Sequence, residues 1–121
     1  MTSENQDGTL QLIQLQAHFQ TEQNGDEIFL KMKGRKIWPQ KKSFFACLKQ
    51  MTQIQLNIEK DVEVKPNHTI AIELWEHDFL FFRKKLGEFN LLVDQKGGPF
   101  ITDLQLKSKE FARYSLMWEV R

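Results

Sequence analysis

Apolar residues recur at every second position along most of the chain, a period typical of β-strands rather than helices. In residues 27 to 33, Ile28, Leu30 and Met32 fall on one face of an expected strand, and most positions between them are charged. The segments with this period span residues 10–20, 27–33, 43–48, 53–64, 69–76, 86–93, 100–106 and 111–120. This pattern predicts an all-β fold, an eight-stranded antiparallel β-sandwich.

The first of these segments changes phase in its middle. Leu10 and Leu12 share one phase, whereas Leu15 and Ala17 share the other. A shift of one residue moves every following side chain to the opposite face of a strand, and a β-bulge absorbs such a shift. We therefore expect a bulge between Leu12 and Leu15.

Turn signals separate the expected strands. Gly34 predicts a turn after the second segment, and the chain then returns through residues 36–38 until Pro39 ends the pairing. Residues 65–68 (Lys-Pro-Asn-His) and residues 94–99, which contain Lys-Gly-Gly-Pro, also have turn composition.

The length of 121 residues favours a single domain. We expect residues 1–9 to form a flexible tail and residues 10–121 to form the domain. A chain of this size buries about two thirds of its extended surface and needs no disulfide. Cys47 is the single cysteine and is expected to be a buried thiol. The sequence shows neither a secretory signal nor an apolar run long enough to cross a bilayer, so we expect a cytoplasmic protein that can associate peripherally with a membrane.

The charges are unevenly distributed, although the net charge is only +1. All charged residues before position 31 are acidic, and the run that follows is basic. This basic run consists of Lys31, Lys33, Arg35, Lys36, Lys41 and Lys42. The basic run has three interpretations: a solvated outer face, a patch that binds lipid phosphate or an acidic partner, or a nucleic-acid surface. The chain lacks the glycine–aromatic motif of RNA-binding sheets, which disfavours nucleic acid.

A loop is expected between residues 76 and 85, and its composition is unusual. Acids come first, four consecutive apolar residues follow, and three cations end the loop. These residues are Glu76, Asp78, Phe79, Leu80, Phe81, Phe82, Arg83, Lys84 and Lys85. An apolar tip beside cations is typical of proteins that enter the headgroup region of a membrane. In the alternative, the apolar side chains fold back and plug one end of the sandwich.

The segment Ile72-Glu-Leu-Trp-Glu-His-Asp, followed by eight residues and Gly87-Glu-Phe, resembles the third calcium-binding loop of C2 domains. Residues 25–32 (Gly-Asp-Glu-Ile-Phe-Leu-Lys-Met) resemble the first loop of that family and the strand after it. The resemblance implies a C2-like sandwich over residues 10–120 with the 21–27 and 76–85 loops at one end. It also places the basic run near the concave-face strands, which carry a polybasic patch in some C2 domains.

The same resemblance implies a set of calcium ligands, and this chain departs from it. The available carboxylates are those of Glu22, Asp26, Glu27, Glu76 and Asp78. Six residues after Asp78, where the family has another acid, this chain has Lys84. Calcium prefers six to eight oxygen ligands with anionic charge, and an ammonium group in that place can act as an internal cation. We therefore expect no obligatory cofactor, with calcium binding and solvated loop acids paired to Arg83 or Lys84 as the two alternatives.

The sequence indicates no catalytic constellation. The three histidines show no metal-ligand spacing, and no nucleophile or phosphate-loop motif is present. We therefore expect a non-catalytic docking module that binds anionic phospholipid through the 76–85 loop and the basic run, without calcium. The alternative is a protein–protein adaptor, or a structural subunit of a larger assembly, that uses the same loop or an edge strand. The sequence does not indicate an oligomeric state.

Overall fold

The computed structural model describes residues 5–19, 26–39, 46–48, 52–77, 83–107 and 113–121. These residues contain ten β-strands and no helix, hence no helix long and apolar enough to cross a membrane. The strands are β1 (Gln6–Phe19), β2 (Asp26–Met32), β3 (Arg35–Trp38), β4 (Ala46–Leu48), β5 (Thr52–Val64), β6 (Thr69–His77), β7 (Arg83–Leu92), β8 (Gly97–Asp103), β9 (Gln105–Leu106) and β10 (Arg113–Val120).

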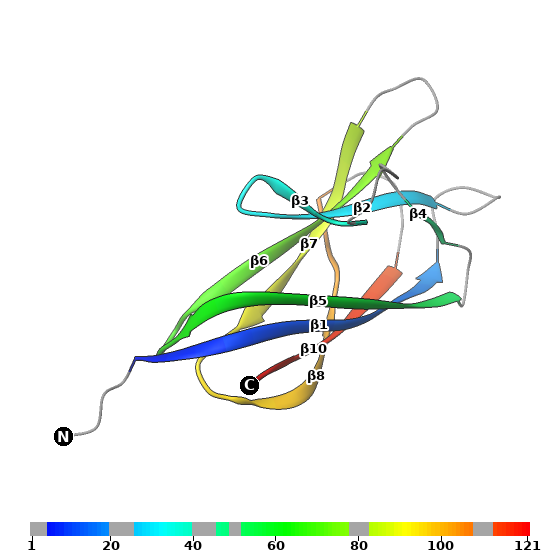
Figure 1. Cartoon of the computed structure of the whole chain (residues 1–121). Helices are drawn as coiled ribbons and strands as arrows, with labels where there is room; N and C mark the ends of the chain where they lie inside the picture. The colour runs from blue at the N-terminus through cyan, green and yellow to red at the C-terminus, as the bar shows by residue number, and fades with distance from the viewer. Residues whose placement is uncertain (1–4, 20–25, 40–45, 49–51, 78–82, 108–112) are drawn as a thin grey trace.

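The strands form two antiparallel sheets that pack face to face (Figure 1). The β1 sheet has the order β5-β1-β10-β8, and the β6 sheet has the order β3-β2-β6-β7-β9, with β4 also pairing to β2. The all-β sandwich predicted from the alternation is therefore confirmed. The number of strands is larger than the expected eight, because residues 35–38 form β3 and the segment expected at 100–106 is divided into β8 and β9.

The phase switch in β1 corresponds to a bulge, as predicted. Pairing with β10 shifts between Leu12 and Gln14, so that Ile13 is an extra residue in β1. The pairing of β1 with β5 shifts at the same place, and Asn57 of β5 has a φ of 54° there. Asparagine tolerates this left-handed conformation better than most residues. The bulge lets both Leu12 and Leu15 point inward, and both are fully buried.

The core consists of the inward faces of both sheets. Aromatic side chains come from each sheet, with Tyr114 and Phe89 fully buried, and Trp118 donates its indole N–H to Thr102 at 2.9 Å. Trp38 is also in the core, only 7% exposed, so it does not form part of a nucleic-acid surface with the basic run. Apolar burial of this kind is the dominant stabilising contribution to a sandwich of this size.

Several of the predicted boundaries were wrong, including the start of β8, which begins at Gly97 within the expected 94–99 turn. β1 begins at Gln6 rather than Leu10, because residues 6–9 pair with the end of β5 and so do not form a tail. β6 continues to His77 and β7 begins at Arg83, so the three cations expected in a loop lie on a strand. Pairing between His77 and Arg83 satisfies backbone groups that a ten-residue loop would leave to solvent.

The start of β2 and the end of β6 lie at the same end of the sandwich, where the 21–27 and 76–85 loops were expected. Ile28, near the start of β2, pairs with Glu76, near the end of β6. The β2–β3 hairpin lies at the other end of β2 and turns at Lys33 and Gly34, which have φ values of 52° and 78°. Two successive positive φ values match the type I′ turn that suits the twist of a hairpin.

Gly87 permits a close approach of β9 to β7. A Cβ atom there would lie 2.9 Å from the carbonyl carbon of Gln105 and closer still to its oxygen. Both neighbours are backbone atoms, so the strands would have to separate. We expect Gly87→Ala to lower the free energy of unfolding by about 2 to 3 kcal/mol, measured by denaturant titration.

Gly34→Asn is the matched control for that substitution. A Cβ at Gly34 meets nothing within 4 Å, and asparagine tolerates its positive φ. The control should change the free energy of unfolding by less than about 1 kcal/mol. Equal effects of the two substitutions would contradict the packing role of Gly87.

Candidate functional site

A pair of aromatic rings lies on the outer face of the β6 sheet. Phe29 of β2 and Trp75 of β6 are cross-strand partners, and their rings stack with centroids 6.2 Å apart and an interplanar angle of 19°. Both side chains point outward, because successive residues of a strand face opposite sides and the neighbours Ile28, Leu30 and Leu74 are buried on the inward side. Phe29 is nevertheless only 3% exposed, so neighbouring side chains cover its ring on this outer face.

Cationic side chains cover the rings. The Nζ atom of Lys31 lies 4.3 Å from the centroid of the Trp75 ring and 5.9 Å from that of Phe29. The guanidinium carbon of Arg83 lies 5.7 Å from the centroid of Phe29. These distances are within the range of cation–π attraction, which contributes about 0.5 to 1 kcal/mol at an exposed site. The aromatic pair therefore holds two cations at defined positions.

These cations border a hollow of about 240 Å³ lined by Phe29, Lys31, Lys36, His77 and Arg83. Lys36 comes from β3, where it pairs with Lys31 of β2, and Arg83 comes from the start of β7. Desolvation by burial, together with repulsion from Arg83, holds the pKa of Lys36 below its ordinary value. An anion in the hollow would relieve this repulsion, so the geometry suits an anionic ligand.

Glu73 fixes one edge of this site. Its carboxylate forms an ion pair with Lys85 at 2.8 Å and accepts a hydrogen bond from Nε1 of Trp75 at 3.3 Å. Hydrogen bonding to Lys85 is the largest cause of the lowered pKa of Glu73, and the same bond raises the pKa of Lys85. Lys85 also pairs with Glu88 at 3.2 Å, so its charge is compensated by two carboxylates.

Glu76 was predicted to be a loop acid, either solvated or a calcium ligand. The structure instead places it in β6, on the inward side of the strand and only 5% exposed, which contradicts the solvated interpretation. Its cross-strand partner is Lys84, the residue that stands where the C2 pattern has an acid. Lys84 therefore lies on the other side of the strand from Arg83 and Lys85, and the three cations do not form one surface.

The basic run is divided in the same way. Lys31 and Lys36 border the hollow, whereas Lys33 and Arg35 lie at the β2–β3 hairpin. The other predicted residues of the basic run and of the loop tip fall outside the described residues: Lys41, Lys42, Phe79, Leu80, Phe81 and Phe82. The β6–β7 connection that contains the four apolar residues starts and ends next to His77 and Arg83, at the edge of the hollow.

The predicted calcium ligands are also only partly described. Asp26 and Glu27 lie at the start of β2, and Glu22 and Asp78 are outside the described residues. The described part of the chain contains no group of three or more histidine, cysteine, aspartate or glutamate side chains able to hold a metal ion.

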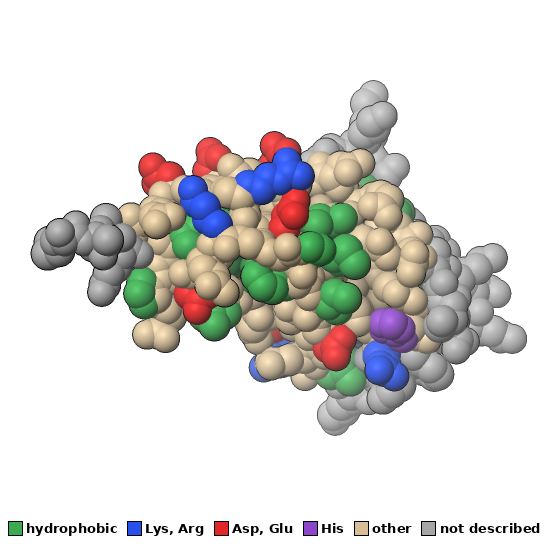
Figure 2. Space-filling model, turned by 90° about the horizontal axis from the view of Figure 1, so that it is seen from below, with side chains coloured by type: hydrophobic (Ala, Val, Ile, Leu, Met, Phe, Trp, Pro, Cys, Tyr) green, Lys and Arg blue, Asp and Glu red, His purple; other side chains and the backbone are tan. Residues whose placement is uncertain are grey.

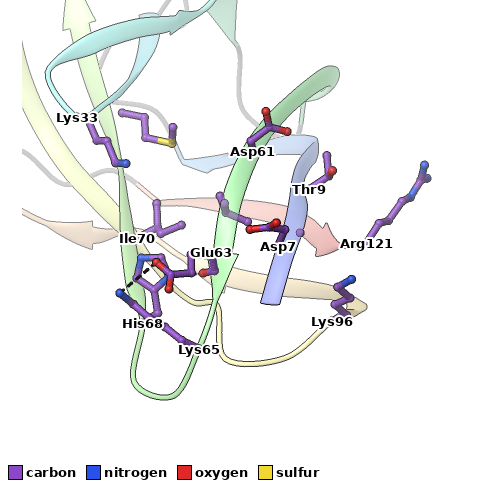
Figure 3. A pocket seen from close by; sticks show the side chains of 13 residues that line it. Asp7, Thr9, Lys33, Asp61, Glu63, Lys65, His68, Ile70, Lys96 and Arg121 are labelled. Carbon is purple, nitrogen blue, oxygen red and sulfur yellow. Dashed lines mark hydrogen bonds and ion pairs between the residues drawn. The ribbon is translucent and has the colours of Figure 1, made fainter. Parts of the chain in front are cut away.

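A larger hollow, of about 930 Å³, lies at the opposite end of the sandwich (Figure 3). Acids from β1 and β5, such as Asp7 and Asp61, face cations that include Lys33 of the β2–β3 hairpin. Lys65 pairs with Glu63 at 3.5 Å within this hollow. Mixed charges of this kind compensate each other and favour no single class of charged ligand, in contrast to the smaller hollow.

A chain of hydrogen bonds links His18, Ser115 and Asp103 on the outer face of the β1 sheet. The hydroxyl of Ser115 donates to Asp103 at 2.7 Å and lies 2.8 Å from Nε2 of His18. Since the serine proton points to Asp103, the imidazole donates to the hydroxyl oxygen. In a nucleophilic triad the histidine instead accepts the serine proton, so this arrangement does not activate Ser115.

Sequence reasoning missed the roles of Phe29, Trp75 and Glu73 in the site. The available signal was an aromatic residue at an outward position in each of two segments, at 29 and 75. The alternation indicated that these residues face outward, but the register that pairs them comes only from the structure.

No protein-family model matches the chain, and no curated protein matches it. Among solved structures, the chain is similar to one described with the words "CC2D1B coordinates ESRCT-III activity during the mitotic reformation of the nuclear envelope". The TM-score is 0.63 at 9% sequence identity, and the match covers 99% of this chain but only 55% of the other. This chain thus spans about half the length of that neighbour. At this identity the similarity shows the fold alone, and the C2-like β-sandwich is confirmed.

The Glu73–Lys85 pair generates a prediction about pH. A carboxyl whose pKa is lowered in the folded state stabilises that state at pH values above its unfolded pKa, ordinarily about 4.5. This stabilisation is lost as the pH falls through the lowered pKa. We expect Glu73→Gln to reduce the free energy of unfolding at neutral pH by less than about 1 kcal/mol, since both side chains are partly exposed.

Urea unfolding at several pH values checks this expectation. The difference between the original protein and the variant should be constant near neutral pH and should shrink below pH 4.5. Glu119→Gln is the control, because it removes a pair with the largely exposed Arg121. A difference that persists unchanged at the lowest pH would contradict the stabilising role of the ionised Glu73.

Proposed function

We propose that the protein is a non-catalytic docking module that binds anionic membrane surfaces through Lys31, Lys36 and Arg83, without a requirement for calcium. One observation supports this proposal most strongly. Cations from three different strands border a single hollow, where desolvation by burial and, to a smaller extent, repulsion from Arg83 lower the pKa of Lys36. A protein gains stability by separating like charges, so their collection at one place indicates an anionic ligand.

The position of the hollow favours a membrane as the source of that anion. The hollow adjoins the β6–β7 connection, whose sequence contains Phe79-Leu-Phe-Phe82. Three basic residues close to an anionic leaflet contribute about 3 kcal/mol. Two inserted phenylalanine rings would add roughly 3 to 4 kcal/mol. The sum approaches micromolar affinity before entropic costs, whereas the cations alone do not reach it.

Independence from calcium is proposed on the basis of Glu76 and Lys84. Glu76 is buried within β6, and its cross-strand partner Lys84 carries the opposite charge. Cross-strand neighbours of opposite charge attract one another, which reduces the need for a bound cation at this end of the sheet.

Sedimentation with vesicles of phosphatidylserine and phosphatidylcholine tests the proposal. The original protein should bind equally well with and without a calcium chelator. Lys36→Glu changes the local charge by two units, each contributing about 1 kcal/mol near the leaflet, so the affinity should fall roughly ten- to thirtyfold. Lys96→Glu makes the same charge change at the opposite end of the sandwich and should leave the affinity within a factor of about three.

The outcomes separate the alternatives. Absence of vesicle binding in both conditions would remove the membrane function. Equal losses in Lys36→Glu and Lys96→Glu would show that net charge, and not the hollow, controls binding. If vesicles do not bind and a stoichiometric protein partner co-purifies instead, the chain is a protein–protein adaptor.

A further inference from the structure

Two carboxylates lie on the same sheet face as the cationic hollow, which is bordered by Lys31, Lys36 and Arg83. Glu73 of β6 and Glu88 of β7 are cross-strand partners on the outer face of the β6 sheet. Like charges directly opposite one another on a strand pair are destabilising. Lys85 relieves this repulsion, because its ammonium forms ion pairs with Glu73 at 2.8 Å and with Glu88 at 3.2 Å. Together the three side chains carry one negative charge.

A β-bulge brings the second of these carboxylates to Lys85. The pairing of β6 with β7 skips Leu86, so this residue is extra in β7, and both Leu86 and Gly87 are buried. Without the extra residue, Lys85 and Glu88 would face opposite sides of the strand, because side chains alternate. With it, both face outward and form their ion pair. The register of the sheet therefore determines that two carboxylates compensate Lys85.

One row of residues across the outer face changes from cationic to acidic. The registers align it in the order Lys36, Lys31, Glu73 and Glu88, from β3, β2, β6 and β7. The two lysines border the hollow of about 240 Å³, and the two glutamates follow them directly along the row. Hydrogen bonding to Lys85 is the largest cause of the lowered pKa of Glu73, and the charge of Lys31 also contributes. Glu73 is thus close enough to act on the cations of the hollow.

Lys85 is the next cation on this face after those of the hollow. It lies two residues after Arg83 on the same side of β7, and its cross-strand partner is Trp75, whose ring Lys31 covers. Lys85 is therefore placed to bind a second phosphate group on a ligand whose first phosphate occupies the hollow. The ion pairs with Glu73 and Glu88 oppose this role, because a phosphate would have to displace two carboxylates.

The outer face of the β1 sheet offers a comparison. Figure 2 shows basic side chains next to acidic ones on that face. Glu119, for example, forms an ion pair with Arg121 at 2.9 Å. Beside the cationic hollow, by contrast, cations from β2 and β3 lie on one side of the row and acids from β6 and β7 on the other.

We propose that Glu73, together with Glu88, determines the specificity of the anion site and restricts it to ligands with a single phosphate group. This inference rests on the proposed function, because it takes the hollow to be the anion site. One phosphate group is held by the cations of the hollow, whereas a second one meets two carboxylates and a lysine that is already paired. The volume of about 240 Å³ agrees with a small ligand, since sites for drug-sized molecules have about 300 to 1,000 Å³.

Isothermal titration calorimetry with inorganic phosphate and with pyrophosphate, which has two phosphate groups, tests the proposal. The original protein should bind pyrophosphate less than about fivefold more tightly than phosphate, fivefold being the effect of one further charge near an anion. Glu73→Gln releases Lys85 from one carboxylate and should raise the affinity for pyrophosphate about fivefold, with a change of less than about twofold for phosphate. The amide oxygen of glutamine can still accept the hydrogen bond from Trp75.

Glu119→Gln is the matched control, because it removes the same charge from an ion pair on the other outer face. It should leave both affinities within about twofold of the original values. Adding Lys85→Gln to Glu73→Gln should restore the original ratio of the two affinities, which a merely structural effect of residue 73 would not do.

A ratio that Glu73→Gln leaves unchanged would overturn the proposal, as would an original protein that prefers pyrophosphate by more than about fivefold. Both probes are soluble, so these outcomes are independent of vesicle binding. A protein that discriminates between the two anions but does not sediment with phosphatidylserine vesicles would retain the specificity proposed here, with free phosphate and not a lipid headgroup as its ligand.

Discussion

The cross-strand stack of Phe29 and Trp75 is the interaction on which the geometry of the site depends. Two aromatic rings on the outer face of a sheet would ordinarily be exposed to solvent, but here Lys31 and Arg83 cover them. Glu73 accepts a hydrogen bond from the indole of Trp75 and is itself held by Lys85. The orientation of one ring is therefore fixed by the sheet register and by a carboxylate at its edge.

This arrangement explains why charged side chains close to one another have different roles. Lys85 forms ion pairs with the carboxylates of Glu73 and Glu88, so its charge is compensated within the protein. Lys31, Lys36 and Arg83 border the same hollow, where desolvation by burial and repulsion from Arg83 lower the pKa of Lys36. In the proposed function such a site is preorganised for an anion, because folding already brings the cations together.

Much of the fold was predictable from local pattern. Alternation identified a strand in each expected segment, and the phase change between Leu12 and Leu15 identified the bulge. The two loop segments that resemble C2 domains placed the β1–β2 and β6–β7 connections at one end. These features depend on residues near one another in sequence, because the alternation of apolar residues and the turn residues determine where each strand and bulge forms.

The site was predictable only in part, because it depends on register between distant strands. The sequence pattern grouped Lys33 with Lys31 and Lys84 with Arg83. In the structure Lys33 lies in the turn after β2, and Lys84 and Arg83 face opposite sides of β7. Conversely, Lys36 and Arg83 belong to different segments of the sequence and meet beside Phe29. Strand ends at His77 and Arg83 were missed because pairing extended into residues with a loop composition.

We propose that the aromatic pair holds Lys31 and Arg83 beside Lys36 to form one anion site, and an NMR titration of the ¹⁵N-labelled protein with inorganic phosphate tests this most directly. The account predicts saturable changes in the amide signals of Phe29, Lys31, Lys36 and Arg83, with little change at Lys65 and Lys96 in the other hollow. Changes spread evenly over the lysines of both hollows, or no saturable change at all, would contradict it.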